Sequence, residues 1–179
     1  MSALPSPETE GVSPDLPCLS GITLRRPGSA DVPGLAALFA EMQRHYGRPV
    51  TEMQATEAAT LACKPPLNVF DLHVIIAIMD GTIIGSAVLN VTFPAYELTR
   101  SLYIRDLYVA SAMRRSGVGK ALVRAAAHLT RVEGFSALDW TTDTTNAGAR
   151  TMYEACGARR LERTYYRLTE EDLAQGNCG

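Results

Sequence analysis

The chain has 179 residues, of which 46% are hydrophobic and 20% charged, and its formal net charge at pH 7 is −2. This composition is typical of one globular domain with its own hydrophobic core. It excludes the strongly basic surface of a nucleic-acid-binding protein, and no apolar run is long enough to span a membrane. Because the N-terminus lacks a secretion signal and the four cysteines have no metal-ligand spacing, we expect a cytoplasmic protein without a metal site.

The first 20 residues combine prolines, serines and acidic side chains with little apolar periodicity. Such a segment cannot bury enough apolar surface to fold, so we expect residues 1–20 to form a disordered N-terminal tail. The folded domain is expected over residues 21–170, with residues 171–179 as a C-terminal tail.

One strand and two helices are expected in the first part of the domain. Residues 22–26 form a short strand. Ser29 is the expected N-cap of a helix whose apolar residues recur at helical spacing as far as Met42, so one face of this helix is buried. A second, weaker helix is expected over about residues 51–63, and the two prolines that follow end it.

A β-hairpin and a central strand follow. Asp80 and Gly81 separate two apolar runs, residues 74–79 and 82–93, and an Asp-Gly pair between such runs is a strong hairpin signal. Residues 102–109 form the next expected strand. Its apolar residues on both faces favour a central position in the sheet.

The last part of the domain alternates between helices and strands. A helix from residue 118 places one apolar stripe on the core: Val118, Ala121, Leu122, Ala125, Leu129 and Val132. A strand is expected over residues 137–142, a helix over 147–156, and the last strands over 158–168. This order predicts a mixed α/β sheet with helices on both faces.

A short basic loop lies between the strand at 102–109 and the helix that begins at residue 118. The first N–H groups of a helix have no internal partner and carry partial positive charge. Glycines allow a phosphate to approach this backbone closely, and Arg114, Arg115 and Lys120 add full positive charges. We therefore predict that a phosphate-bearing ligand binds at the start of the helix.

Two common phosphate loops do not fit this sequence. A Walker loop has a hydroxyl residue after its lysine, but Lys120 is followed by Ala121. A Rossmann turn has a third glycine, where this chain has Leu122. The pattern that remains, Arg-x-x-Gly-x-Gly at residues 114–119, resembles the pyrophosphate loop of the GNAT superfamily of acetyl-CoA-dependent N-acetyltransferases. Residues 146–157 are similar to that family's Asn-x-x-Ala-x-x-x-Tyr-Glu-x-x-Gly helix.

The resemblance covers about residues 22–168. It implies a mixed α/β fold with a central, mostly antiparallel twisted sheet of six to seven strands, splayed at the acetyl-CoA site and flanked by about four helices. It further implies direct transfer of an acetyl group from acetyl-CoA to a primary amine of a small molecule, such as an amino acid or a polyamine, in a ternary complex. A homodimer is also implied, because many relatives place C-terminal residues that correspond to Tyr165, Tyr166 and Leu168 at a subunit interface.

Tyr153 is the general acid that the resemblance implies, because a phenol can protonate a departing thiolate of similar basicity. Tyr153 also shares an apolar stripe with Met152 and Cys156, so a core tyrosine remains an alternative. Asn146 is expected both to cap its helix and to contact coenzyme A. The residues expected at the cofactor are Leu107, Tyr108, Val109, Arg114, Arg115, Ser116, Gly117, Val118, Gly119, Lys120 and Asn146. No metal is implied.

The acceptor side departs from the branch that the chain most resembles, the polyamine and histone acetyltransferases. Those enzymes typically read Leu-Tyr-x-Glu-Asp, with the glutamate as general base, but here Arg105 takes that position and cannot be a base. Strand alternation places Arg105 on the face of Leu107, and Asp106 on the opposite face. An arginine that faces the site would attract a carboxylate rather than a polycation.

The identity of the general base stays open. The candidates are Glu41, His45, Tyr46 and Asp143, and a water relay without a dedicated base is equally compatible with the sequence. The residues expected to contact the acceptor are His45, Tyr46, Tyr96, Arg105 and Asp143.

Two other functions remain possible. One is acetylation of lysine side chains or N-termini of proteins and peptides. The other is a non-catalytic acyl-CoA sensor, which the intact Tyr153 argues against and the missing glutamate at position 105 favours.

Overall fold

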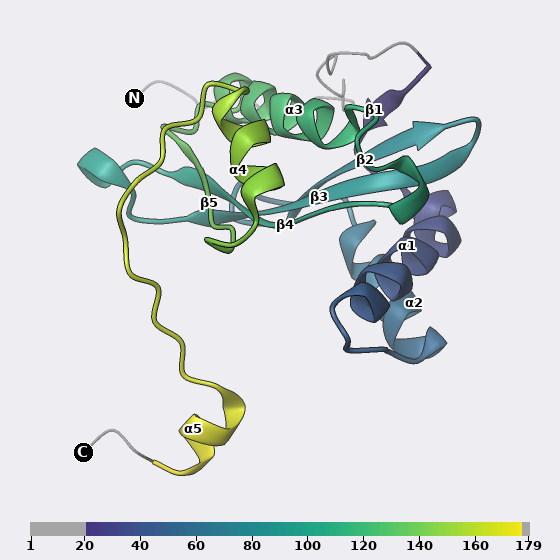
Figure 1. Cartoon of the computed structure of the whole chain (residues 1–179), viewed down its shortest axis with the longest axis horizontal. Coiled ribbons are helices and arrows are strands. Elements are labelled where there is room, and N and C mark those ends of the chain that lie inside the picture. Colours follow the sequence, from purple (N-terminus) through teal and green to yellow (C-terminus); the bar gives the residue numbers. More distant parts are fainter. Residues whose placement is uncertain (1–20, 177–179) are drawn as a thin grey trace, which may run out of the picture.

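The computed structural model describes residues 21–176, and a five-stranded sheet lies at its centre (Figure 1). The strands lie side by side in the order in which they occur in the chain. Their bounds are β1 Thr23–Arg25, β2 His73–Met79, β3 Thr82–Thr92, β4 Ser101–Val109 and β5 Leu138–Trp140. The first three pairings are antiparallel and β4 pairs with β5 in parallel. The mixed α/β fold with a mostly antiparallel sheet is confirmed.

Helices cover both faces of the sheet (Figure 1). The helices α1 and α2 lie on one face, and α3 and α4 lie on the other, while α5 stands away from the body. Their bounds are α1 Val32–His45, α2 Glu52–Ala62, α3 Val118–Val132, α4 Ala147–Glu154 and α5 Glu170–Ala174. Three short 3₁₀ turns complete the list: η1 Ser29–Asp31, η2 Tyr96–Leu98 and η3 Ser111–Met113. No helix within residues 21–176 is both long and apolar enough to cross a membrane.

The sheet separates two hydrophobic layers. On one face the α3 stripe packs against β2, β3 and β4, with Leu122 and Leu129 fully buried against Leu102. On the other face α1 and α2 pack against β2, with Leu35 next to Ile76 in the same cluster. The predicted α3 stripe is therefore confirmed, except at its last member. Val132 lies in the final turn, beyond the sheet, and is 48% exposed.

The start of α1 differs from the prediction. Ser29 does not cap the helix, because residues 29–31 form the separate turn η1. Asp31 stabilises this turn, since its carboxylate accepts a hydrogen bond from the backbone N–H of Gly28 at 2.7 Å and pairs with Arg25. The carboxylate therefore satisfies the backbone N–H of Gly28, directly before the turn.

A β-bulge in β4 positions the functional site. In the pairing of β3 with β4, Val88 lies opposite Asp106 and Leu89 lies opposite Ile104, so Arg105 is an extra residue without a partner. The bulge shifts the alternation of side chains by one residue. Ile104 and Leu107 therefore pack into the same layer against α3, whereas strict alternation along the strand, which the sequence analysis assumed, would place them on opposite faces.

The strands expected over residues 158–168 are absent from this structure. Within residues 21–176 the sheet has five strands, and the chain after α4 runs as an extended segment away from the body to α5 (Figure 1). A pattern of alternating apolar residues becomes a strand only when another strand pairs with it. The expected C-terminal tail includes α5, which Thr169 caps. The expected disordered tail, residues 1–20, lies outside the described residues.

Candidate functional site

The loop that leads into α3 has the backbone geometry of an anion site. Gly117, the N-cap of α3, has φ 89°, and Arg115 has φ 63°. Glycine adopts this left-handed conformation at little cost, whereas arginine does so rarely. No side chain caps the helix, so the first N–H groups of α3, at Val118, Gly119 and Lys120, have no intrahelical partner. These groups and the helix dipole can bind a phosphate.

Positive side chains surround these free N–H groups. Arg114 and Arg115 are exposed and Lys120 is half-buried. Arg114 stacks its guanidinium over the ring of Tyr108, 5.5 Å from the ring centroid. The hydroxyl of Ser116 points into the loop and donates to the carbonyl of Met113. The three cations and the open helix end together fit the pyrophosphate of a coenzyme.

Gly119 faces the junction between α3, α4 and β4. A Cβ atom placed on Gly119 would lie 3.7 Å from Met152, 3.8 Å from Val109 and 3.9 Å from Leu107. A single methyl group would therefore only touch these side chains, while a branched side chain would have to displace them. This geometry leaves the approach to the first turn of α3 unobstructed in the natural sequence.

The sheet opens next to this loop. The two strands β4 and β5 pair only from Leu102 to Ile104 and from Leu138 to Trp140, whereas β4 continues to Val109. The backbone of Leu107–Val109 therefore has no strand partner on its β5 side among the described residues. An extended ligand can pair with such a free edge. The side chain of Tyr108 is not available to it, because it is buried against α1 and donates a hydrogen bond to Glu41.

Tyr153 lies on α4 beside this opening. Asn146 caps α4 as expected, since its side-chain oxygen accepts from the N–H of Ala149 at 3.1 Å. The ring of Tyr153 packs against Trp140 of β5, with ring centroids 5.1 Å apart. None of the residues of α4 is fully buried. Burial of the phenol raises the pKa of Tyr153, and the charges of Tyr46 and Asp106 add to this effect, so the hydroxyl is protonated at neutral pH.

Asp106 lies on the same opening, directly after the bulge. Burial raises the pKa of this carboxyl group, and the charge of Arg105 and the N–H of Leu107 oppose the shift. Partial burial also raises the pKa of Tyr46, at the end of α1, and the charge of Asp106 adds to it. Tyr46, Asp106 and Tyr153 therefore form one group of interacting side chains from α1, β4 and α4, which we call the opening cluster.

Asp106 is the residue that the sequence analysis missed as a candidate for the site. The sequence motif identified Arg105 as the residue at the expected base position. Strict alternation of side chains along the strand placed Asp106 on the face opposite Leu107, so Asp106 was not considered as a base. The bulge has no local sequence signal, because it is defined by the pairing between β3 and β4.

The other base candidates are less suited to accept a proton. Glu41 accepts hydrogen bonds from the hydroxyl of Tyr108 at 3.0 Å and the N–H of Ser111 at 2.8 Å. The Ser111 N–H is the main reason that the pKa of Glu41 lies below its usual value, so Glu41 anchors the loop instead. His45 is exposed and its ring packs 5.3 Å from that of Tyr46 and 6.1 Å from that of Tyr108.

The remaining acceptor candidates occupy different places. Asp143 is exposed after β5, and its charge acts on Tyr46. Arg105 is exposed at the bulge. Tyr96 lies in η2, before β4. The structure thus brings Asp143 close to the opening cluster, of which Tyr46 is a member.

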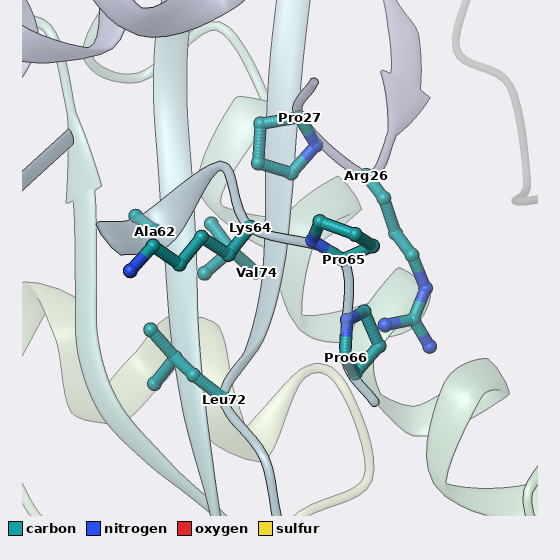
Figure 2. A pocket seen from close by; sticks show the side chains of 8 residues that line it. All are labelled: Arg26, Pro27, Ala62, Lys64, Pro65, Pro66, Leu72 and Val74. Carbon is teal, nitrogen blue, oxygen red and sulfur yellow. The ribbon is translucent and has the colours of Figure 1, made fainter. Parts of the chain in front are cut away.

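Two hollows lie outside this site. Figure 2 shows a small one of about 110 Å³, where Pro65 and Pro66 at the end of α2 face Arg26 and Pro27. None of the predicted site residues lines it, and it is too small for a coenzyme. A larger hollow of about 800 Å³ lies between α1, the β2–β3 turn and η3, and Glu41 and Arg44 are among its polar residues. No group of three or more potential metal ligands occurs within the part of the chain described.

Comparisons with known proteins agree with this geometry. The sequence model of the acetyltransferase (GNAT) family matches residues 37–158. The uncharacterized N-acetyltransferase YhfO of Bacillus subtilis is 29% identical over 136 residues, which cover 76% of this chain and 89% of that protein. An integron cassette protein of V. cholerae has the same fold, with a TM-score of 0.75, 24% identity and coverage of 89% of this chain and 99% of that one.

An aminoglycoside acetyltransferase, meta-AAC0020, from an uncultured soil metagenomic sample also shares the fold. Its structure has a TM-score of 0.66 and 19% identity, and the match covers 84% of this chain and 98% of that chain.

Proposed function

The chain belongs to the acetyltransferase (GNAT) family and is an N-acetyltransferase, and we propose that it transfers an acetyl group from acetyl-CoA to the primary amine of a small molecule that carries a carboxylate. The observation that carries this proposal is the opening cluster beside the free end of α3. A protonated phenol and a carboxylate with a raised pKa meet there, next to a site that fits a pyrophosphate.

The residues divide the work in the following way. The N–H groups at the start of α3, with Arg114, Arg115 and Lys120, hold the pyrophosphate. The free backbone of Leu107–Val109 aligns the pantetheine arm and can polarise the carbonyl group. Acetyl-CoA supplies an activated thioester in this position.

Two side chains of the opening cluster move protons. Asp106 accepts the proton that the attacking amine nitrogen loses, because a carboxylate with a raised pKa is a better base than an ordinary aspartate. Tyr153 donates its phenolic proton to the sulfur as the bond between carbonyl carbon and sulfur breaks. A base and an acid in the same cluster allow direct transfer without a covalent enzyme intermediate.

Arg105 supports the choice of acceptor. Its guanidinium is exposed beside Asp106, and it forms no ion pair with another described residue. A carboxylate on the acceptor can form a bidentate pair with this side chain. A polycation would be repelled by Arg105, which argues against the polyamine substrates of the branch that the sequence resembles.

A panel of amines tests this function by the release of free thiol from acetyl-CoA. The panel contains amino acids, polyamines, aminoglycosides and peptides. We expect the highest kcat/KM for a carboxylate-bearing small amine, and we expect Arg105→Ala to raise KM for it more than Arg105→Lys does. Turnover with peptides alone would identify a peptide acetyltransferase, and the absence of turnover despite acetyl-CoA binding would identify a sensor.

Acetyl-CoA is expected to stabilise the fold. Ligand at about 100 times its dissociation constant adds about 2.7 kcal/mol to the free energy of unfolding, which a thermal scan detects as a higher Tm. Gly119→Val should abolish the shift, because its two methyl groups would crowd Met152, Val109 and Leu107 and displace the first turn of α3. Arg124→Val, at an exposed position of α3, is the matched control and should retain it. A Tm shift with ATP or NAD but none with acetyl-CoA would refute the assignment of the loop.

A further inference from the structure

Two charged side chains, Arg105 and Asp143, lie beside the opening cluster and act on its members. Both are exposed, and neither forms an ion pair or a side-chain hydrogen bond with another residue of the range 21–176. The carboxylate of Glu41, by contrast, is held by Tyr108 and Ser111. Arg105 and Asp143 are therefore charges that the fold leaves available to a bound acceptor.

The turn that connects β5 to α4 carries Asp143. The backbone carbonyl of Asp143 accepts the N–H of Asn146 at 3.0 Å, and the side chain of Asn146 caps α4, so the carboxylate of Asp143 is not needed for the helix cap. Burial raises the pKa of Tyr46, and the charges of Asp106 and Asp143 add to the shift. The carboxylate of Asp143 is therefore close enough to act on the hydroxyl of Tyr46, at the end of α1.

The bulge in β4 places Arg105 directly before Asp106 at the opening. Arg105 is the extra residue of the bulge and has no partner residue on β3. Because the two residues are consecutive, their side chains suit two groups that are also neighbours on the acceptor. The α-amine and the carboxylate of an amino acid share one carbon atom. Asp143 comes from another element of the fold, so it suits a part of the acceptor further from that carbon.

We propose that the acceptor is a diamino acid, whose carboxylate pairs with Arg105, whose α-amine receives the acetyl group beside Asp106, and whose side-chain ammonium pairs with Asp143. This inference rests on the proposed function and adds to it the class of the acceptor and the nitrogen that reacts. Tyr46 is 56% exposed, and its ring adds to the binding of the ammonium because an aromatic face attracts a cation.

A diamino acid uses both available charges, whereas simpler acceptors leave one of them unpaired. A polyamine has no carboxylate for Arg105, and a monoamino acid has no second ammonium for Asp143. A carboxylate can form a bidentate pair with a guanidinium, and a carboxylate beside an ammonium favours the charged form of that ammonium. The three charged residues Arg105, Asp106 and Asp143 therefore each have one group of the acceptor to bind.

The same charges decide which nitrogen reacts. The neutral α-amine attacks the carbonyl carbon of the thioester, and Asp106 takes the proton that this nitrogen loses. The bond between carbon and sulfur breaks, and the sulfur keeps its electron pair and takes the proton of Tyr153. Asp106 and Tyr153 then exchange their protons with water. The side-chain nitrogen stays an ammonium in its pair with Asp143 and has no free electron pair for attack. An α-amine also loses its proton at lower pH than a lysine side chain does.

Three matched acceptors test the proposal by thiol release at saturating acetyl-CoA. Norleucine lacks only the side-chain amine of lysine, and cadaverine lacks only its carboxylate. We expect kcat/KM for lysine to exceed that for norleucine at least about fivefold, the factor that corresponds to an exposed ion pair of about 1 kcal/mol, and to exceed that for cadaverine as well. Ornithine, norvaline and putrescine repeat the comparison with a side chain shorter by one methylene group. Mass spectrometry of the product should locate the acetyl group on the α-nitrogen.

Asp143→Asn should bring the ratio of kcat/KM for lysine to that for norleucine close to one. Calorimetry on the protein saturated with coenzyme A should show weaker binding of lysine to this variant but not of norleucine. Asp139→Asn is the matched control, because Asp139 is an exposed carboxylate on β5, and it should keep the ratio of the wild type. The Tm shift with acetyl-CoA, measured for both variants, should equal that of the wild type.

The outcomes separate this inference from the proposed function. If lysine and norleucine react equally well, ornithine and norvaline do so too, and all exceed the diamines, the proposed function stands and the diamino acid is wrong. If the diamines exceed all four amino acids, the carboxylate of the proposed function is wrong as well. An acetyl group on the side-chain nitrogen, or an equal loss of the lysine preference in Asp139→Asn and Asp143→Asn, would also overturn the inference.

Discussion

Asp106→Asn is expected to lower kcat/KM by about 10²–10⁴-fold, the usual contribution of a general base. The amide has the size of the carboxylate but cannot accept the proton of the attacking amine. The affinity for acetyl-CoA, measured by its Tm shift, should change little, because Asp106 lies on the acceptor side of the bulge and not at the start of α3. Activity and cofactor binding are therefore expected to separate in this variant.

The pH profile provides a second readout for Asp106. A base acts only when it is ionised, so the rate of the wild type should rise with pH through the pKa of Asp106. Because burial raises this pKa, the acid limb should lie above the value of about 3.9 of an ordinary aspartate. Asp106→Asn should lack the limb. If Asp143→Asn removes the limb and Asp106→Asn does not, the base is Asp143.

The contribution of Asp106 to the free energy of unfolding should fall as pH rises, in the opposite direction to the rate. The folded chain binds a proton at Asp106 more readily than the unfolded chain does, so this group favours folding most at low pH and less as pH rises through its folded pKa. At neutral pH the buried carboxylate therefore opposes folding. The Tm of Asp106→Asn should not fall at pH 7, and an inactive variant with a much lower Tm would indicate a structural role instead.

Elements with a strong local signal could be predicted from the sequence. The Asp-Gly pair at residues 80 and 81 requires only its two flanking apolar runs to specify the β2–β3 hairpin, which the structure contains. The apolar stripe of α3 follows from the helical period. The loop before α3 could also be predicted, because its glycines and positively charged residues are adjacent in sequence to the start of the helix.

Features that depend on pairing between distant segments could not be predicted. The bulge at Arg105 exists only in the register between β3 and β4, so the sequence analysis applied strict alternation across it and searched α1 and the residues after β5 for a base. Residues 158–168 carry several apolar side chains, but no strand of the described residues pairs with them. At Ser29, the carboxylate of the nearby Asp31 accepts from the N–H of Gly28, and residues 29–31 form a separate turn.

Glu41 connects α1 to the end of β4 and to the loop that follows β4. Its carboxylate joins the hydroxyl of Tyr108 to the N–H of Ser111, and so fixes the end of β4 against α1 at the point where the loop begins. The loop proposed to hold the pyrophosphate and the strand that carries Asp106 are therefore positioned by one carboxylate. The arrangement explains why an acidic residue near the reaction centre need not be the base.

Tyr153→Phe is expected to lower kcat by at least about tenfold, because general acid catalysis typically contributes about 10²–10⁴-fold. Only the hydroxyl is lost, so the ring keeps its contact with Trp140 and the affinity for coenzyme A should stay nearly constant. Burial holds the pKa of Tyr153 above its usual value. The wild-type phenol therefore stays protonated at pH 9, and the ratio of wild-type to variant rates should be the same from pH 7 to 9.

Tyr103→Phe is the matched control for this change. Tyr103 lies on β4, in the part of the strand that pairs with β5. Its hydroxyl forms a hydrogen bond with that of Thr141 at 2.8 Å, and neither residue belongs to the opening cluster. Its loss should leave kcat nearly unchanged. If Tyr153→Phe keeps full turnover, the proton for the sulfur comes from water. If Tyr153→Phe instead lowers the Tm without a specific loss of rate, Tyr153 is a packing residue of α4. The hydroxyl of a general acid acts on the departing sulfur, so its removal should not change the stability of the fold.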